Sequence, residues 1–159
     1  MANLKERTLV ILKPDALQRG ILGELIHRFE RKGLKVVAIK MAKLSDLLLN
    51  KHYAHHKDKP FFTGLKKFMR SSPVVLMVLE GLESVRVARQ ICGPTDGKNA
   101  PAGTIRGDFS ISTQANIIHT SENTVVAKQE IKRFFKLSEL FEYRKCDLEF
   151  IYGVEERSH

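Results

Sequence analysis

A single histidine, His119, stands between a short apolar run and several polar residues in the stretch NIIHTSE. A lone histidine beside an apolar run is usually a hydrogen-bonded core residue, so a catalytic role needs support from its neighbours. Ser121 lies two positions further on and is also expected to cap a helix that begins near Asn123. Glu130 lies on the edge of that helix's apolar stripe, where its carboxylate can point inward toward a histidine and a serine. This combination indicates a reactive group held by hydrogen bonds.

The surroundings of Ser121 argue against a serine nucleophile. A serine hydrolase places its serine in a strand–turn–helix G-x-S-x-G elbow, and that pattern does not surround Ser121. An imidazole is largely neutral at pH 7 and can attack phosphorus directly, whereas a lysine amine must first lose a proton. A phosphate on an imidazole nitrogen also keeps a high transfer potential, while a serine phosphate ester is stable. We therefore expect Ser121 to be a support and not a nucleophile, which leaves His119 as the candidate nucleophile.

Strands and helices alternate along the chain. Three apolar, β-branched runs predict strands, namely TLVILK (8–13), LKVVAIKMAK (34–43) and PVVLMVLEG (73–81). Apolar residues at helical spacing predict helices over 22–32, 45–56, 61–69, 82–91 and 123–135. The segment 93–115 lacks periodicity and is rich in turn residues, and a loop of that length in a compact domain is usually functional.

Length and composition bound the class of protein. The chain of 159 residues suits one domain over 1–159, with a polar tail, 153–159, that could be loosely held. No apolar run reaches the roughly 20 residues of a membrane-spanning helix, and the amino terminus lacks a secretory signal. We therefore expect a cytoplasmic protein with no membrane partner. The formal net charge of +9 favours anionic partners, namely nucleotides, nucleic acid or acidic surfaces.

Three further motifs carry less weight. GPTDGKN (93–99) fails as a phosphate-binding P-loop because its glycines are one residue too close and a helix precedes it. RGD (106–108) is an adhesion tripeptide in secreted proteins, but a match of three residues is common. HYAHH places His52 one helical turn from His55 and His56, a spacing that could hold a metal at the surface. We expect these histidines to be solvated and no metal to be held by protein ligands.

Four motifs together resemble the nucleoside diphosphate kinases. They are LKPDALQRG, KPFFTGL, PAGTIRGDF and NIIHTSE, in the order of that family, and the match runs with hardly a gap from Glu6 to Tyr152. The resemblance implies a ferredoxin-like α/β (α+β) sandwich with a four-stranded antiparallel sheet flanked by helices. It also implies transfer of the terminal phosphate of a nucleoside triphosphate, typically ATP, to a nucleoside diphosphate. The implied mechanism is ping-pong, through a phosphohistidine and with little base specificity.

The resemblance also implies a role for each site residue. His119 would be the nucleophile, with Glu130 and Ser121 holding it in orientation. Lys13 and Arg106 would neutralise charge on the transferring phosphoryl group. The rest of the nucleotide would be held by polar and aromatic side chains at its other phosphate, its ribose 3′-hydroxyl and its base. Those side chains are Arg89, Thr95 and Tyr53 for the phosphate, Asn116 with Lys13 for the ribose, and Phe61 and Thr113 for stacking on the base.

The cofactor and the assembly follow from the same resemblance. No pair of aspartates suggests a dedicated site, so Mg²⁺ is expected to arrive on the nucleotide phosphates. A chain that continues past Tyr152 resembles the longer members, which form hexamers of identical subunits. Two positions depart from the family, since Thr120 follows the histidine where Gly or Ala is usual and Gly97 replaces a proline linked to stable assembly. The alternative is a basic nucleic-acid-binding protein on the same fold, and the even scatter of Lys and Arg makes that a secondary activity.

Overall fold

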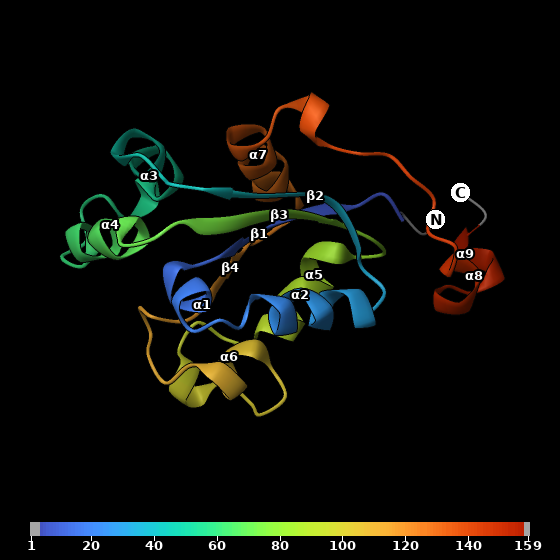
Figure 1. Cartoon of the computed structure of the whole chain (residues 1–159), viewed down its shortest axis with the longest axis horizontal. Coiled ribbons are helices and arrows are strands. Elements are labelled where there is room, and N and C mark those ends of the chain that lie inside the picture. The colour runs from blue at the N-terminus through green and yellow to red at the C-terminus, as the bar shows by residue number, and fades with distance from the viewer. Residues whose placement is uncertain (1–3, 158–159) are drawn as a thin grey trace.

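Continuous apolar runs bury both faces of the two central strands, and the computed structural model, which describes residues 4–157, joins four strands into one sheet (Figure 1). The strands are β1 (Arg7–Leu12), β2 (Lys35–Ala42), β3 (Val74–Glu80) and β4 (Ile118–Thr120). Their order is β2-β3-β1-β4, and every neighbouring pair is antiparallel. The three strands expected from the sequence and the four-stranded antiparallel sheet are both confirmed.

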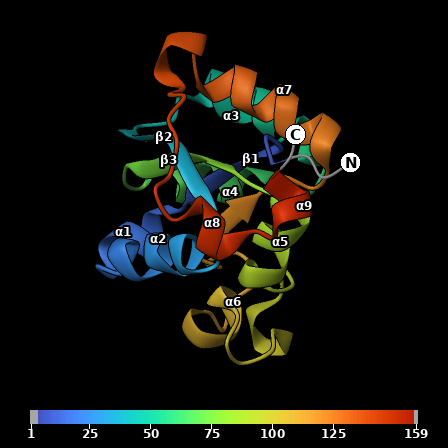
Figure 2. The same ribbon diagram turned by 90° about the vertical axis from the view of Figure 1, so that its right-hand side faces the viewer.

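Side chains alternate between the two faces of each strand, so each face carries its own hydrophobic core. On β1, Leu9 and Ile11 pack on one face, whereas Val10 and Leu12 pack on the other. The first face is covered by α3 (Asp46–His52), α4 (Phe62–Arg70) and α7 (Thr124–Phe134). The second is covered by α1 (Pro14–Gln18), α2 (Leu22–Arg31) and α5 (Ser84–Cys92), as Figure 2 shows from the side. These layers confirm the ferredoxin-like α/β sandwich.

The long segment 93–115 is not a plain loop. It contains a 3₁₀ turn, η2 (Gly97–Asn99), and a short helix, α6 (Ile105–Phe109). Thr104 caps α6, since its hydroxyl accepts a hydrogen bond from the N–H of Gly107 at 3.0 Å. Five helical residues are too few to show an apolar period, and for this reason the sequence pattern did not predict the helix.

The predicted helix over 45–56 is divided. α3 ends at His52, and a separate 3₁₀ turn, η1 (Ala54–His56), follows Tyr53. The other four predicted helices correspond to α2, α4, α5 and α7, with small differences at their ends.

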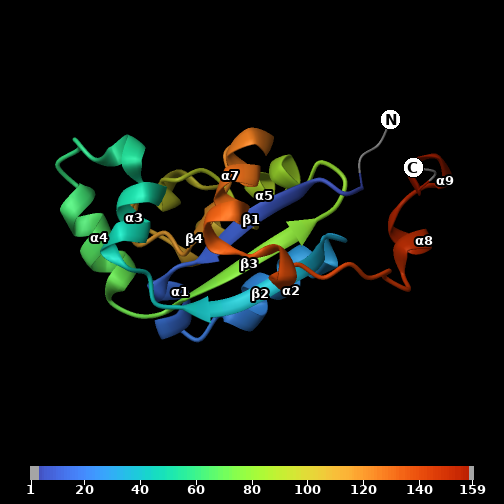
Figure 3. The ribbon, with the colours of Figure 1, turned by 90° about the horizontal axis from the view of Figure 1, so that it is seen from above.

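The carboxyl-terminal segment begins with a 3₁₀ turn, η3 (Leu137–Glu139), whose Glu139 forms an ion pair with Lys40 of β2. Two short helices, α8 (Leu148–Ile151) and α9 (Val154–Arg157), follow and lie at the opposite end of the sheet from α3 and α4 (Figure 3). The tail 153–159, expected to be loosely held, is therefore helical over 154–157, and its last two residues lie outside the described part of the chain. Among the described helices, none is both long enough and apolar enough to cross a membrane.

Candidate active site

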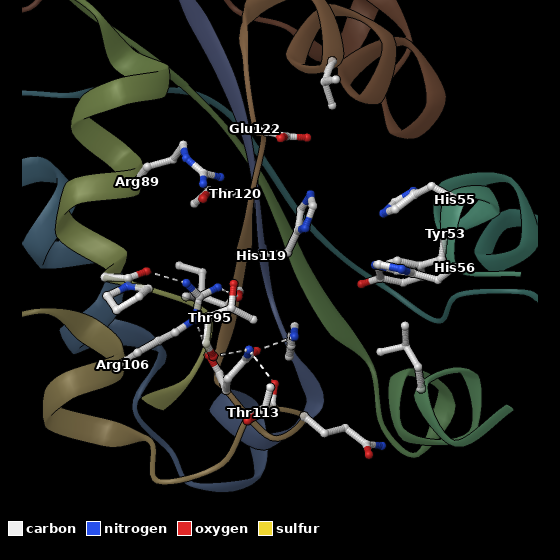
Figure 4. Close-up of a pocket in the computed structure, with 18 of the residues that line it drawn as sticks. Tyr53, His55, His56, Arg89, Thr95, Arg106, Thr113, His119, Thr120 and Glu122 are labelled. Carbon is white, nitrogen blue, oxygen red and sulfur yellow. Dashed lines mark hydrogen bonds between the residues drawn. The ribbon is translucent and has the colours of Figure 1, made fainter. Parts of the chain in front are cut away.

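A cavity of about 700 Å³ opens beside β4 and brings the predicted site residues together. Every one of them except Ser121 lines it, namely Lys13, Tyr53, Phe61, Arg89, Thr95, Arg106, Thr113, Asn116, His119 and Glu130. In Figure 4, His119 stands between Arg89 and Thr120 on one side and Tyr53, His55 and His56 on the other. Residues that are far apart in the sequence thus surround one imidazole.

His119 is held by a carboxylate. Its Nε2 lies 3.0 Å from Oε1 of Glu130, whose other oxygen accepts a hydrogen bond from the Ser121 hydroxyl at 2.6 Å. Ser121 is fully buried and also accepts from the N–H of Leu9 on β1, so it does not cap α7 as expected. Asn123 does so, by accepting a hydrogen bond from the N–H of Val126. Ser121 supports the carboxylate from behind the cavity, in agreement with a role other than nucleophile.

The protonation state of Glu130 decides which nitrogen of His119 is free. Burial alone raises the pKa of Glu130, but the hydrogen bonds and charge from His119, together with the bond from Ser121, outweigh burial and lower the pKa overall. The ionised carboxylate can only accept, so Nε2 of His119 carries the proton that it donates. Nδ1 keeps its lone pair and has no hydrogen-bond partner among residues 4–157. The side chain is 22% exposed, which leaves this lone pair open to a ligand in the cavity.

Two cations lie at the floor of the cavity. Lys13 is buried, donates to the side-chain oxygen of Asn116, and has its pKa lowered to about 8 by burial and by the charge of Arg106. Arg106 is also buried and donates to the carbonyl oxygens of Asn116 at 3.2 Å, Gly93 at 2.6 Å and Ile118 at 2.6 Å. A guanidinium has five N–H groups, so each terminal nitrogen of Arg106 keeps one for a ligand. A rigidly held pair of cations therefore faces the nucleophile.

Asn116 joins the separate parts of the site. Its amide N–H groups donate to the carbonyl oxygens of Thr95 at 3.0 Å and Thr113 at 2.8 Å, while its oxygen accepts from Lys13. The next residue, Ile117, has a φ of 73°, a strained conformation for a β-branched side chain. Its N–H donates to Asp15 at 3.0 Å and its carbonyl accepts from the N–H of Lys13 at 2.9 Å. These bonds hold the strained turn and fix Asn116 and Lys13 relative to β4.

Two further predicted ligands have polar groups available. The hydroxyl of Tyr53 is buried without a hydrogen-bond partner among the described residues, although Tyr53 lines the cavity beside His119. An unpaired buried hydroxyl is unfavourable, so a bound oxygen anion is a natural partner for it. The guanidinium of Arg89 on α5 is exposed at the cavity and makes no ion pair with any residue from 4 to 157.

The outer end of the cavity is apolar and open. Phe61 at the start of α4 is 49% exposed, and His56 meets its ring edge-on at 5.2 Å. Thr113 and Gln114 line the facing loop, and the amide nitrogen of Gln114 would lie 3.8 Å from a Cβ built on Gly64 of α4. Gln114 was not among the predicted residues, and only its position after Thr113 could have indicated it.

His52 was predicted to be solvated, and this prediction is wrong. It is only 4% exposed, because Tyr53, His119 and Phe134 of α7 surround its ring. The sequence pattern of α3 marks a residue on a helix but does not show that α7 will cover it. His55, in contrast, is exposed as expected.

A metal site built from protein ligands does not fit Mg²⁺. Among the described residues, His52, His119 and Glu130 could gather around an ion. Mg²⁺ prefers an octahedron of oxygens and keeps several waters, whereas this cluster offers two imidazoles and one carboxylate. Both oxygens of Glu130 are already hydrogen-bonded. This cluster is therefore a poor match for Mg²⁺.

Thr120 and Gly97, the two positions that depart from the family pattern, are both closely surrounded by other groups. Thr120 lines the cavity next to His119, and its side chain acts against the rise that burial causes in the pKa of the Cys92 thiol. Gly97 is packed so tightly that an added Cβ would lie 2.6 Å from the carbonyl oxygen of Ser110. A proline at this position would require the loop to move, so the loop is built around the glycine.

The chain is similar to known proteins over most of its length. A family model described as nucleoside diphosphate kinase matches residues 6–140. The nucleoside diphosphate kinase of Parabacteroides distasonis is 48% identical over 151 residues, covering 95% of this chain and 99% of the relative. Nucleoside diphosphate kinase B of Homo sapiens is 48% identical over 152 residues, covering 96% and 99%. A solved structure, that of a halophilic nucleoside diphosphate kinase from Halobacterium salinarum in complex with CDP, has a TM-score of 0.92 at 42% identity and covers 94% of this chain and 99% of that one.

Proposed function

The chain belongs to the nucleoside diphosphate kinase family of phosphotransferases, and we propose that it passes the phosphate through a phosphohistidine on Nδ1 of His119. The observation that carries the proposal is the contact between Nε2 of His119 and Glu130, which leaves Nδ1 as the free nitrogen in a cavity lined by cations. Glu130 then balances the positive charge that develops on the imidazole ring during attack.

The reaction has two half-reactions with the same nucleophile. The Nδ1 lone pair attacks the terminal phosphorus of a nucleoside triphosphate, and an N–P bond forms as the bond to the bridging oxygen breaks. The diphosphate leaves with that bridging oxygen. A terminal oxygen of an incoming nucleoside diphosphate then attacks the same phosphorus, and the N–P bond breaks. The Nε2 proton stays on the side of Glu130 throughout.

The other predicted residues bind charge and position the nucleotide. Lys13 and Arg106 would hold the transferring phosphoryl oxygens, and the unpaired Tyr53 hydroxyl would donate close by. Arg89 and Thr95 would bind the next phosphate. Mg²⁺ on the nucleotide phosphates would supply further neutralisation. The amide N–H groups of Asn116 already donate to backbone carbonyl oxygens. Its side-chain oxygen, beside Lys13, would therefore accept a hydrogen bond from the ribose 3′-hydroxyl.

Labelled ATP tests the intermediate. Incubation of the protein with Mg²⁺, γ-labelled ATP and no acceptor should leave one phosphate per chain on His119, removed by acid and stable to alkali. Any nucleoside diphosphate should then discharge it, since the phosphoenzyme lies on the pathway. A label with the opposite stability, or one found on Ser121, would show that a serine ester forms instead.

Little discrimination between bases is expected at the outer end of the cavity. Phe61 offers an exposed ring for stacking, which every base can use. The relative from Halobacterium salinarum was solved with CDP, and this supports a pyrimidine diphosphate in the same place. Phe61→Ala should therefore lower kcat/KM for purine and pyrimidine diphosphates alike. The decrease should correspond to a loss of roughly 1 to 3 kcal/mol of stacking free energy. Steady-state kinetics with four diphosphates measures this, and a loss confined to one base would contradict it.

We further propose a hexamer of identical subunits. β2 lies at the edge of the sheet and exposes Ile39 (51%) and Met41 (57%), and apolar side chains on an edge strand favour pairing with another chain. Light scattering at micromolar concentration should give the mass of six chains. A mass of one chain would exclude stable assembly, and a mass of four would show that the longer tail was misinterpreted.

We also propose that residues 1–159 form a single domain and that the protein is cytoplasmic. For the anionic partner we prefer nucleotide phosphates to nucleic acid, because Lys13, Arg89 and Arg106 converge on one cavity of nucleotide dimensions.

A further inference from the structure

A second imidazole packs directly against the nucleophile. His52 ends α3, and its ring centroid lies 4.7 Å from that of His119 with an angle of 76° between the planes. Tyr53 and Phe134 contact the same ring, at 4.5 and 5.0 Å, so His52 fills the space behind His119 without lining the nucleotide cavity. No role in binding or transfer has been given to it above.

Arg133 fixes the orientation and tautomer of this second ring. Its Nη1 lies 3.2 Å from Nδ1 of His52. Because a guanidinium only donates, Nδ1 of His52 is the acceptor, and the proton of the neutral ring is on Nε2. Arg133 and Glu130 lie on the same helix, α7, so this helix holds both imidazoles.

The neutral state of His52 protects the bond between His119 and Glu130. Nδ1 of His52 lies 3.7 Å from Oε1 of Glu130, the oxygen that accepts from His119. A protonated His52 would compete for that oxygen. Burial, followed by the charge of His119, lowers the pKa of His52 to about 3, and Arg133 and His55 act in the same direction against the opposing effect of Glu130. At neutral pH, Oε1 of Glu130 therefore accepts its hydrogen bond from His119 without competition from His52.

We propose that His52 is a positioning residue, whose ring stops the His119 imidazole from turning and so keeps Nδ1, and not Nε2, toward the phosphate. One hydrogen bond to Glu130 would still let the ring pivot, whereas a bond and an edge-to-face contact together fix its plane. This inference rests on the proposed phosphohistidine. It adds a second contact that holds the ring in the orientation set by the bond to Glu130.

Three substitutions separate the ring from its hydrogen bond. His52→Ala removes both, His52→Phe keeps a ring but cannot accept from Arg133, and His52→Asn keeps an acceptor without a ring. We expect His52→Ala and His52→Asn to lower kcat by about 10- to 100-fold with little change in KM, because misplaced reacting atoms slow the chemical step. His52→Phe should recover most of the loss. His27→Ala is the matched control, since His27 is exposed on α2, and should behave as wild type.

The position of the phosphate is the decisive readout. Each phosphoenzyme is denatured in alkali, and phosphorus NMR distinguishes phosphate on Nδ1 from phosphate on Nε2. Wild type, His27→Ala and His52→Phe should carry it on Nδ1, while His52→Ala and His52→Asn should show a mixture. Thermal melting and light scattering report whether each variant is folded, and a folding defect in His52→Ala still leaves His52→Phe and His52→Asn to compare.

The results of these experiments distinguish a failure of the positioning role of His52 from a failure of the proposed function. A wild-type protein without phosphate on His119 would contradict the proposed function itself. Phosphate only on Nδ1 in folded His52→Ala and His52→Asn would refute the positioning role and leave the function intact. Recovery by Asn but not by Phe would likewise overturn it, because the bond to Arg133 and not the ring would then be what matters.

Discussion

Replacing His119 by alanine should abolish phosphate transfer while nucleotide binding stays nearly unchanged. The alanine variant has no nitrogen to form the intermediate, and loss of a nucleophile lowers kcat by on the order of 10⁵-fold or more. Lys13, Arg106 and Phe61 are held by contacts that do not involve His119, so the ligand keeps its main binding groups. Coupled spectrophotometric assays give turnover, and calorimetric titration with a diphosphate gives the dissociation constant.

Ser121→Ala provides the matched comparison for this variant. Ser121 donates to Glu130 behind the nucleophile, so its loss should slow transfer by only about 10-fold. If His119→Ala kept near-normal turnover, His119 would be a buried structural histidine. If Ser121→Ala were the inactive variant, the hydroxyl would be the nucleophile.

Replacing Lys13 by methionine should lower kcat/KM by about 10²- to 10³-fold, the usual effect of losing one electrostatic group at a transition state. The variant should also lose a pH dependence that the wild type shows. Burial and Arg106 lower the pKa of Lys13 to about 8, and the ammonium is the form that binds phosphate. Wild-type kcat/KM should therefore fall as the pH rises above about 8, whereas Lys13→Met should be flat there.

The loss of activity at alkaline pH can be distinguished from a loss of stability. The pKa of Lys13 is lowered from 10.5 to about 8 on folding, so the unfolded chain binds more protons between these values. The contribution of Lys13 to the free energy of unfolding thus rises with pH over that interval, opposite in direction to the activity. Lys128→Met, which removes an exposed lysine from α7, should still show the decrease of kcat/KM at alkaline pH. If it also lost this decrease, or if Lys13→Met kept it, another group would be titrating.

Patterns that are local in the sequence were predicted well. The continuous apolar runs of β1 and β3 are visible in a short window of the chain, because a residue buried on either face must be apolar whatever lies above it. The resemblance to the family carried further, since it assigned Lys13 and Glu130, which are far apart in the sequence, to one site, and both side chains line the same cavity. Short elements were missed, as α6 shows, because five residues do not complete two helical turns.

The sequence by itself determined the chemical groups of the site, and the tertiary structure decided their states. Types and spacing indicate that His119, Ser121 and Glu130 work together, but only the fold shows that Nε2 is bound and Nδ1 is free. His52 illustrates the same limit, since its burial comes from α7, a helix more than 70 residues further along the chain. Burial and long-range charge set the pKa of such a group, and neither quantity is a property of the neighbouring sequence.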